Sequence, residues 1–326
     1  MLNNNLINQF ENIPVLVIGD LMIDAYLFGN VDRISPEAPV PIVAVNKKEN
    51  RLGGAANVAL NLTALGAKPI ICSVIGNDLE GNDLINLLSK NNIDASGIIQ
   101  SNDRLTTVKT RVISQNHQML RIDNEITNNL NNELTDLLIE KAKGLLTRVK
   151  IVIFEDYDKG VITEKLITEI TKAANQLGIS TVVDPKKRNF NFYNHVTLFK
   201  PNLKELREGT NENFLVDDKK HFESICKALM LKMNLKYLFV TLSEKGVLIT
   251  DGKTFNYIPA HFRKIADVSG AGDTVISVAS LCLALNIPIE QIAAISNLAG
   301  GLVCEEVGVV PINKSKLAQE LTEIGL

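Results

Sequence analysis

The chain of 326 residues has few of the features that mark specialised classes of protein. Tryptophan is absent, aromatic residues make up 5%, and glycine (20) and proline (10) are too sparse for a fibrous or low-complexity chain. The formal net charge is −3, without the basic excess of a dedicated nucleic-acid-binding protein. Hydrophobic residues make up 45%, too many for a disordered chain and enough for a large core. These figures predict a soluble globular protein.

Signals for export or membrane insertion are also missing. The first residues, MLNNNLINQFENIP, contain neither a basic stretch nor an apolar core, so they do not resemble a secretory signal. The most apolar run, Val275 to Leu285, falls short of the roughly 20 residues of a membrane span. The four cysteines are widely spaced within apolar runs, as buried reduced thiols are: Cys72, Cys226, Cys282 and Cys304. We therefore expect a cytoplasmic protein with no membrane partner and no nucleic-acid partner.

What is present is an alternation of strand-like and helix-like segments. Short β-rich runs occur at Val15–Gly19, Ile70–Ile75, Lys150–Phe154, Ser180–Val183, Thr197–Phe199 and Tyr237–Thr241. Segments with helical spacing lie between most of them, such as Ala55–Leu65, which ends before Gly66, and Leu79–Lys90. This alternation predicts an α/β fold with a mostly parallel sheet flanked by helices.

Two segments interrupt the alternation. Pro41–Val45, and Thr106–Ser114 with Gln118–Asp123, alternate apolar and polar residues as half-buried antiparallel strands do. The second pair is typical of a hairpin that turns at Gln115–His117. We expect a small β-sheet lid, inserted at about residues 24–50 and 98–123 of a single domain covering residues 1–326. Because the exposed edges of such a lid would be covered well by a second lid, we also expect a homodimer formed through it.

The segment DVSGAGDT, residues 267–274, precedes the most apolar helix. Its glycines at 270 and 272 leave backbone N–H groups exposed at the helix start, where the helix dipole favours an anion. Asp273 follows in the first turn, where a carboxylate is either a helix cap or a base that takes a proton from a substrate hydroxyl. Because Ser269 or Thr274 could cap the helix, a carboxylate beside a phosphate cradle favours the base.

Two further segments lie where a substrate could bind. In RLGGAAN, residues 51–57, the paired glycines permit either close approach of a ligand or close packing of a helix, and Asn57 can both donate to and accept from a hydroxyl. Asp20 and Asp24 follow the first predicted strand, at the edge where ligands of α/β sheets bind. Carboxylates at that edge suit the recognition of a polyol.

Other charged residues permit two interpretations each. Asn202 and Glu205 stand three apart at a predicted helix start, where they form either a capping box or a site for hydrated Mg²⁺ or nucleotide phosphate. Basic residues of the expected lid form either a solvated face or a site for a substrate phosphate: Arg33, Lys109, Arg111 and Arg121. The four histidines are too far apart to suggest a metal site.

In this order the motifs resemble the ribokinase-like (PfkB) sugar kinases. DVSGAGDT resembles the anion-hole and catalytic-base signature of that family, and GGAANVALNLTALGA, residues 53–67, resembles its N-terminal signature. The resemblance continues through Asp184-Pro185, NLKE at 202–205 and TLSEKG at 241–246. RISPEAPVPIV, LRID and EDYDKG, which begin at residues 33, 120 and 155, resemble the subfamily that phosphorylates D-glycero-β-D-manno-heptose 7-phosphate.

The resemblance implies a ribokinase-like fold and transfer of the ATP γ-phosphoryl group to the anomeric hydroxyl of heptose 7-phosphate. The product would be the 1,7-bisphosphate, for the heptose of lipopolysaccharide core or a related glycan. The resemblance implies ATP and Mg²⁺ as cofactors, and it leaves open whether a monovalent cation is also required. One alternative is a kinase of another sugar or sugar phosphate. A catalytically silent sugar-binding sensor is another, against which the retained Asp273 argues.

Roles for single residues follow from the same resemblance. It implies Asp273 as base, with an anion hole formed by Gly270, Ala271 and Gly272. Nucleotide contacts are implied at Asn202, Glu205, Thr241, Ser243, Gly246 and Ser269, with Asn202 and Glu205 serving Mg²⁺ through water. Sugar contacts are implied at Asp24, Gly53, Gly54 and Asn57, and contacts to the 7-phosphate at Lys109, Arg111, Arg121 and Arg33.

Two features depart from the heptose kinase pattern. Ala25 stands where these kinases often carry an arginine, which removes one contact to phosphate or lid. No histidine begins the HxGH motif of a nucleotidyltransferase, so we expect no such domain in the chain and adenylylation by another polypeptide.

Overall fold

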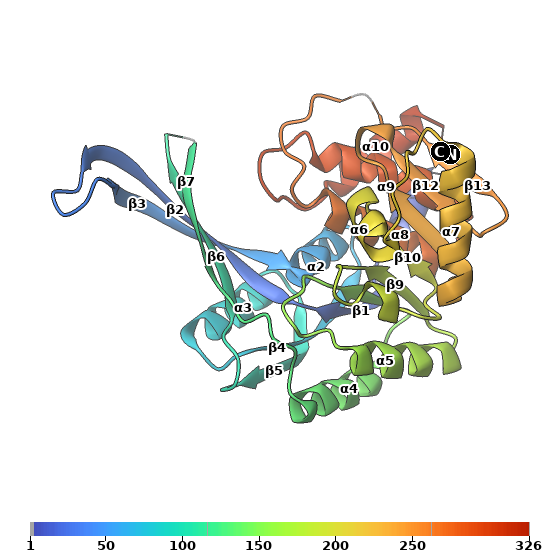
Figure 1. Ribbon diagram of the computed structural model, residues 1–326, viewed down its shortest axis with the longest axis horizontal. Helices are drawn as coiled ribbons and strands as arrows, with labels where there is room; N and C mark the ends of the chain where they lie inside the picture. The colour runs from blue at the N-terminus through green and yellow to red at the C-terminus, as the bar shows by residue number, and fades with distance from the viewer. Residues whose placement is uncertain (1–2, 116, 262, 326) are drawn as a thin grey trace.

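The computed structural model describes residues 3–115, 117–261 and 263–325 (Figure 1). Within them, the main sheet has the strand order β13-β12-β11-β10-β9-β8-β1-β4-β5. The strands are β1 Pro14–Gly19, β4 Lys68–Gly76, β5 Asp94–Ser101, β8 Ile151–Glu155, β9 Ser180–Asp184, β10 Leu198–Phe199, β11 Tyr237–Thr241, β12 Val247–Thr250 and β13 Phe255–Ile258. In this order, the seven neighbouring strands from β11 to β5 run parallel to one another. Strand β12 pairs antiparallel with β11, and β13 pairs antiparallel with β12. The prediction of a mostly parallel sheet is confirmed.

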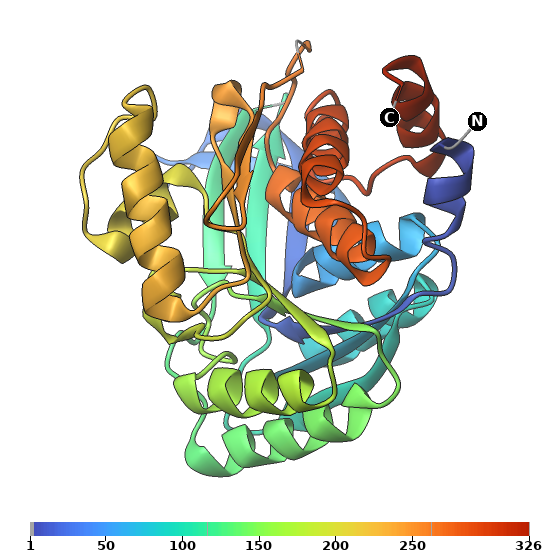
Figure 2. The same cartoon turned by 90° about the vertical axis from the view of Figure 1, so that its right-hand side faces the viewer.

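Helices cover both faces of this sheet (Figure 2). One face carries α1 Asn3–Asn8, α2 Ala55–Ala64, α3 Leu79–Lys90, α8 Ala271–Ala284, α9 Ile289–Val303 and α10 Lys314–Glu323, and the other carries α4 Asn132–Leu146, α5 Glu164–Gln176, α6 Leu203–Thr210 and α7 Lys219–Met233. Side chains of β1 alternate between the two cores, with Val17 in the first and Leu16 in the second. Because both faces of the sheet are buried, the central strands are apolar throughout, and this allowed them to be predicted from the sequence.

A second sheet projects from the body as a lid (Figure 1). Its strand order is β3-β2-β6-β7. The strands are β2 Leu21–Ile34, β3 Pro41–Gly54, β6 Thr107–Ser114 and β7 His117–Asn124. Strand β2 begins two residues after the end of β1, so the lid grows directly out of the centre of the main sheet. Strands β6 and β7 form the predicted hairpin.

The lid differs from the prediction in several respects. Strand β2 was not predicted, because its inner half, Leu21–Tyr26, is buried on both faces and shows no alternation. Strand β6 pairs with β2 in parallel, not antiparallel, orientation. Residues 98–101 belong to β5 of the main sheet, so the second lid segment begins at Thr107 and not near residue 98. Every residue of strand β7 is exposed, so neither face of the strand is buried.

Two other expectations concern the environment of the chain. Cys72, Cys226 and Cys282 are buried free thiols, as predicted, whereas Cys304 is only half-buried. No helix in the described part of the chain combines the length and the apolarity needed to cross a membrane.

Candidate active site

The carboxyl ends of neighbouring parallel strands meet the start of helix α8. Gly19, Glu155 and Asp184 are direct register partners at the ends of β1, β8 and β9, so the side chains of Glu155 and Asp184 leave the sheet in the same direction. Lys200 follows β10 and donates its backbone N–H to Val183. A Cβ placed on Gly272 would lie 3.6 Å from Asp184 Oδ2 and 3.8 Å from Lys200 Nζ. The first turn of α8 therefore lies directly over this row of charged side chains.

The start of α8 has no side-chain cap. Gly270 is the N-cap residue and adopts a left-handed conformation with φ 81°, which favours glycine. Neither Ser269 nor Asp273 caps the helix, so the capping interpretation of Asp273 is wrong. The Ala271 N–H donates a long bond of 3.3 Å to the Val268 carbonyl, while the structure gives the Gly272 N–H no acceptor among the described residues. Gly272 therefore offers the free donor at a terminus whose dipole attracts anions.

Asp273 is buried, with 6% of its surface exposed, and its two oxygens point to different partners. Asn57 Nδ2 donates to Oδ2 at 2.5 Å, and the Tyr157 hydroxyl donates to Oδ1 at 3.0 Å. Burial raises the pKa of Asp273 to about 6, against the lowering effect of the Asn57 hydrogen bond. The carboxylate is thus held in one orientation, with a basicity suited to general-base catalysis near neutral pH.

Two lysines and three carboxylates surround this group. Lys200 Nζ lies 2.9 Å from Asp184 Oδ2, and Lys186 Nζ lies 2.6 Å from Glu205 Oε1. Burial alone would lower the pKa of Lys200, yet Asp184 and the other carboxylates raise it, so the ammonium stays charged. Glu155 is fully buried, and burial raises the pKa of its carboxyl well above the usual range, with Asp184 and Asp273 adding to the effect. The site is highly charged although it is largely closed to water.

Asn202 and Glu205 form the capping box of α6. Asn202 Oδ1 accepts from the Glu205 N–H at 2.8 Å, and Glu205 Oε2 accepts from the Asn202 N–H at 2.9 Å. Glu205 Oε1 accepts from Lys186 Nζ. The side-chain oxygens of Asn202 and Glu205, which are the atoms that could ligate a metal, therefore already accept hydrogen bonds within the protein. The two residues fit Mg²⁺ only through intervening water, and their metal role stays a prediction.

The loop after β8 is fastened to Asp20. The Asp20 carboxylate, 1% exposed, accepts from the backbone N–H groups of Tyr157, Lys159 and Val161 at 2.8, 3.1 and 3.0 Å. These bonds fix the start of the loop and hence the tyrosine that contacts Asp273. The sequence suggested Asp20 as a sugar ligand, but in the structure its carboxylate oxygens accept hydrogen bonds from backbone N–H groups.

The predicted sugar residues lie around the start of α2, and Asn57 among them contacts Asp273. A side chain on Gly53 would collide with the Asp24 carboxylate, and one on Gly54, which has φ 61°, with the Asp20 carbonyl. The glycines are therefore explained by close packing. Asn57 is different, because its Oδ1 is buried and has no hydrogen-bond partner among the described residues. That oxygen is available to accept from a bound hydroxyl.

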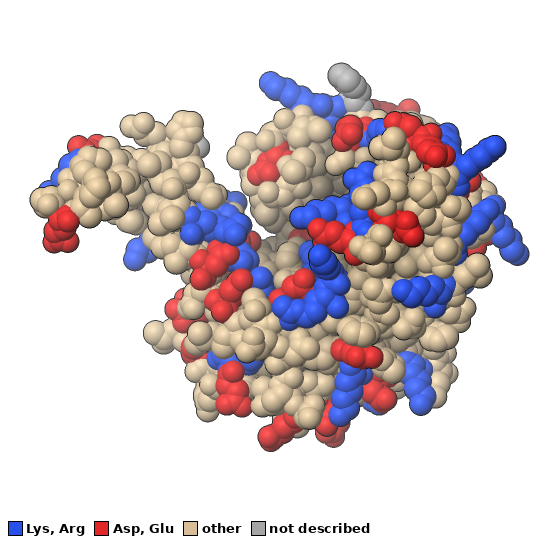
Figure 3. Space-filling model, viewed as in Figure 1, with Lys and Arg blue, Asp and Glu red and all other residues tan. Residues whose placement is uncertain are grey.

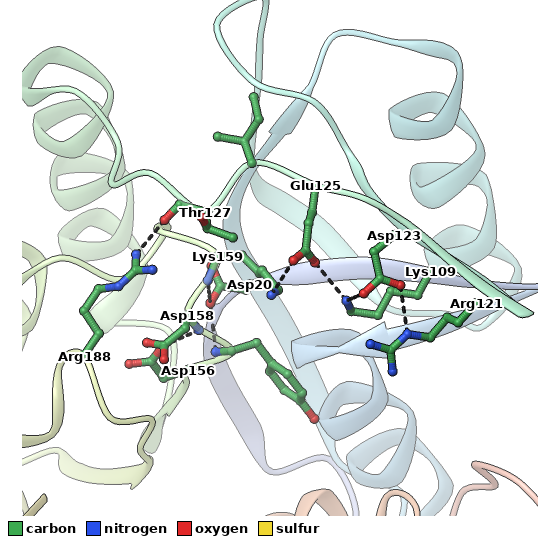
Figure 4. A network of polar contacts seen from close by, with 12 residues as sticks. Asp20, Lys109, Arg121, Asp123, Glu125, Thr127, Asp156, Asp158, Lys159 and Arg188 are labelled. Carbon is green, nitrogen blue, oxygen red and sulfur yellow. Dashed lines mark hydrogen bonds and ion pairs between the residues drawn. The ribbon is translucent and has the colours of Figure 1, made fainter. Parts of the chain in front are cut away.

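The lid cations are brought near this region, but most of them already have acidic partners (Figure 4). Lys109 Nζ binds Asp123 at 2.9 Å and Glu125 at 2.8 Å, and Glu125 also binds Lys159 at 2.9 Å, which ties the lid to the loop after β8. Arg121 binds Asp123 at 3.0 Å.

Arg111 and Arg33 occupy opposite ends of the lid. Arg111 Nη1 binds Asp24 Oδ1 at 2.5 Å, and this guanidinium is 23% exposed. Arg33 is exposed on the outer half of β2, about 30 Å along the strand from Asp24, so one copy of the chain does not bring it to the site. In the space-filling view a hollow with both acidic and basic side chains separates the lid from the body (Figure 3).

The predicted nucleotide residues lie beside α6 and beyond β11. Thr241 forms a β-bridge with Asn202. Ser243 is exposed in the short helix Ser243–Lys245, and Gly246 is buried at the turn into β12 with φ 88°. Ser269 is exposed just before α8. The structure thus places Thr241 with Asn202, and Ser269 with the start of α8.

Sequence reasoning did not assign roles to several residues that the fold brings to Asp273. They are Glu155, Tyr157, Asp184, Lys186 and Lys200. Glu155, Tyr157 and Asp184 lie in motifs that were noted only as parts of a resemblance, and Lys186 and Lys200 were given no role. The available signal was position, because each lies at or just after the carboxyl end of a predicted parallel strand.

Comparisons with known proteins identify the family of this chain. The sequence model of the pfkB family of carbohydrate kinases matches residues 13–316. The chain belongs to the pfkB family of carbohydrate kinases. It is an ATP-dependent sugar kinase, as the motifs predicted.

Curated relatives of this kinase carry the name "Bifunctional protein HldE". The protein from Geotalea uraniireducens is 36% identical over 97% of this chain, and that from Methylobacillus flagellatus is 40% identical over 96%. This chain spans 64% of the length of each of them.

Solved structures show the same fold at low sequence identity. Phosphofructokinase-2 from Escherichia coli, in its tetrameric inhibited form, superposes with a TM-score of 0.78 at 19% sequence identity. The superposition covers 95% of this chain and 99% of the phosphofructokinase chain. The ribokinase of Arabidopsis thaliana, complexed with ribose and ATP, superposes with a TM-score of 0.70 at 17% identity and covers 94% of this chain and 99% of its own. The prediction of a ribokinase-like fold is confirmed.

Proposed function

We propose that this kinase transfers the γ-phosphoryl group of ATP to the anomeric hydroxyl of D-glycero-D-manno-heptose 7-phosphate, giving the 1,7-bisphosphate in ADP-heptose biosynthesis. The observation that carries the transfer step is the buried Asp273 beside the uncapped start of α8. The choice of heptose is supported by the segments RISPEAPVPIV, LRID and EDYDKG. A kinase of another sugar or sugar phosphate is the alternative.

The mechanism follows from the orientation of Asp273. Its carboxylate accepts the proton of the attacking hydroxyl, while Asn57 and Tyr157 keep its oxygens directed at the substrate. The N–H groups at the start of α8, with Gly272 foremost, stabilise negative charge on the transferring group. Lys200 and Lys186 add positive charge beneath it. Mg²⁺, when bound, neutralises phosphate charge, and a monovalent cation requirement stays a prediction.

A coupled assay with ATP, Mg²⁺ and heptose 7-phosphate tests the proposed substrate. We expect the highest kcat/KM for this sugar phosphate within a panel that includes ribose, fructose and fructose 6-phosphate. A higher kcat/KM for an unphosphorylated sugar would contradict the heptose proposal and leave the kinase assignment intact.

Arg111 is the strongest candidate for a contact to the 7-phosphate, because it lies at the inner end of the lid next to Asp24. We predict that Arg111→Ala raises KM for the sugar phosphate at least tenfold and KM for ATP less than twofold, since a charge-assisted contact contributes roughly 1.5–3 kcal/mol. Steady-state kinetics with each substrate varied measures both values. Arg33→Ala is the control, and equal effects on both KM values would remove Arg111 from phosphate recognition.

The pH dependence of turnover reports the base. Because the pKa of Asp273 is raised to about 6, the carboxyl is protonated below that pH and cannot accept a proton. We predict that kcat/KM falls about tenfold per pH unit below pH 6 and levels off above it. Burial also raises the pKa of Asp156 to about 6, so circular dichroism over the same range must show the fold intact. A flat profile between pH 5 and 8 would contradict the role of Asp273.

We propose that two copies pair through their lids. Leu27, Val112 and Leu120 are direct register partners on β2, β6 and β7, so they form an apolar row on one lid face. Leu120 and the nearby Ile122 are 56% and 51% exposed. A second lid would cover these side chains and the open strand edges.

The lid contact predicts a shift in oligomeric state. We expect Leu120→Glu to convert a dimer to a monomer, because it places a charge in the apolar row, whereas Gln118→Glu on the same strand leaves the dimer intact. Light scattering after size-exclusion chromatography measures the mass. A wild-type monomer at micromolar concentration would exclude the lid dimer.

We further propose that the kinase acts in the cytoplasm, where ATP is available.

A further inference from the structure

A chain of ion pairs runs from the lid to the loop after β8 (Figure 4). Glu125 lies at its centre, because Oε2 binds Lys109 Nζ at 2.8 Å and Oε1 binds Lys159 Nζ at 2.9 Å. Lys109 also binds Asp123, which in turn binds Arg121. Three cations thus alternate with two carboxylates, and the chain begins and ends with a cation. These five groups lack one negative charge for balance.

The two lysines that hold Glu125 come from separate parts of the fold. Lys109 belongs to β6 of the lid, and Lys159 belongs to the loop that Asp20 fastens to the body. Both side chains are mostly covered, with 15% and 16% of their surface exposed. Because like charges repel strongly where water is scarce, two such ammonium groups come together only around an anion. A carboxylate of the protein or an anionic group of a substrate can fill that place.

The lysine pair lies beside the residues that we propose to bind the sugar. Lys109 is the direct register partner of Asp24 on β2. Lys159 follows two residues after Tyr157, whose hydroxyl contacts the proposed base. Arg111, a proposed contact to the sugar phosphate, lies two residues beyond Lys109 and therefore on the same face of the lid. An anion held by the two lysines would adjoin both the sugar contacts and the loop that carries Tyr157.

We infer that Lys109 and Lys159 form a binding site for the phosphate group of the sugar substrate, and that the Glu125 carboxylate occupies this site while no substrate is bound. A phosphate monoester carries a charge of about −1.5 to −2 at pH 7, and lysine is a common phosphate ligand. With this group in place of the carboxylate, about three negative charges face the three cations of the chain, and the displaced carboxylate becomes hydrated. That the phosphate belongs to a sugar rests on the proposed function. The exchange of one anion for another does not.

Glu125→Gln separates this exchange from a purely structural tie between lid and body. Glutamine keeps the size of the side chain and removes the charge that competes with phosphate. We expect KM for the sugar phosphate to fall at least threefold, while KM for ATP changes less than twofold. A structural tie predicts the opposite sign, a higher KM for the sugar phosphate. Lys159→Met should raise KM for the sugar phosphate at least tenfold and KM for ATP less than twofold.

Inorganic phosphate gives a second readout, which does not depend on turnover. The nucleotide site is first filled with a non-hydrolysable ATP analogue and Mg²⁺, so that only other sites remain open to phosphate. We expect phosphate to raise the thermal midpoint of Glu125→Gln more than that of the wild-type chain, relative to chloride at the same ionic strength. The midpoint of Lys159→Met should not respond.

The matched controls change one charge at exposed positions on other helices. Glu133→Gln, in the first turn of α4, and Lys90→Met, in the last turn of α3, should behave as the wild type does in both measurements. The inference is overturned if Glu125→Gln raises KM for the sugar phosphate, if Lys159→Met raises both KM values equally, or if phosphate stabilises Lys159→Met and Glu125→Gln alike. Rejection of heptose 7-phosphate in the substrate panel leaves the phosphate readout intact, so the two proposals fail independently.

Discussion

Asp273→Asn lowers kcat by roughly 10²–10⁴ while KM for ATP and for the sugar changes less than threefold, because general-base catalysis contributes about that factor and the amide keeps the size of the carboxyl. The expected loss is large because the group is buried and each oxygen has a fixed partner, Asn57 on one side and Tyr157 on the other. Rapid-quench measurement of product formation in a single turnover isolates the chemical step.

The matched control for this variant is Tyr157→Phe. It removes one hydrogen bond to Asp273 but leaves the carboxylate, so we expect a loss in kcat of tenfold or less. Asp273→Asn should also lose the acid limb of the pH profile, whereas Tyr157→Phe should keep it. Unchanged single-turnover rates in Asp273→Asn would remove the residue from the mechanism.

Lys200→Met lowers the free energy of unfolding by about 3–5 kcal/mol, which is the typical cost of removing one partner of a buried ion pair. The ammonium is 3% exposed and lies 2.9 Å from Asp184. Its removal leaves Asp184, beside Glu155 and Asp273, with only the long 3.9 Å ion pair to Lys186. Urea unfolding followed by circular dichroism measures the change.

Lys204→Met is the matched control, because this lysine lies four residues away, is 83% exposed and forms only a long contact of 3.9 Å with Glu208. Exposed pairs of this kind contribute about 0.5 kcal/mol or less. If Lys200→Met and Lys204→Met unfold at the same urea concentration, the buried pair does not stabilise the fold.

The body of the fold could be predicted from the sequence because its signals are local. Leu79–Lys90 was predicted to the residue, and the apolar runs predicted the parallel strands other than β5, which is only partly buried. Strand β2 could not be predicted, since Leu21–Tyr26 is buried on both faces and its pairing partners lie far along the chain in β3 and β6. Strand β7 alternates without having a buried face, so periodicity described it wrongly.

The residues of the candidate site also differ in whether the sequence alone could reveal them. Asp273 and the glycines around it could be singled out in the sequence because they form one contiguous motif at a helix start. Tyr157, Glu155 and Lys200 act through contacts across the sheet, which spacing along the chain does not encode. The basic residues of the lid were recognised as cations, but their acidic partners, such as Glu125 for Lys109, appear only in three dimensions.

The attachment of β2 has a mechanical consequence. A 14-residue strand is a lever of about 46 Å with its root beside Asp20, so a tilt of 10° would displace its outer end by about 8 Å. Asp20 sits at the pivot, and its three backbone bonds belong to the body. Displacement is therefore greatest at the tip and vanishes toward the root. A tilt of this kind would move the tip of the lid far more than Tyr157, which the Asp20 bonds hold beside Asp273.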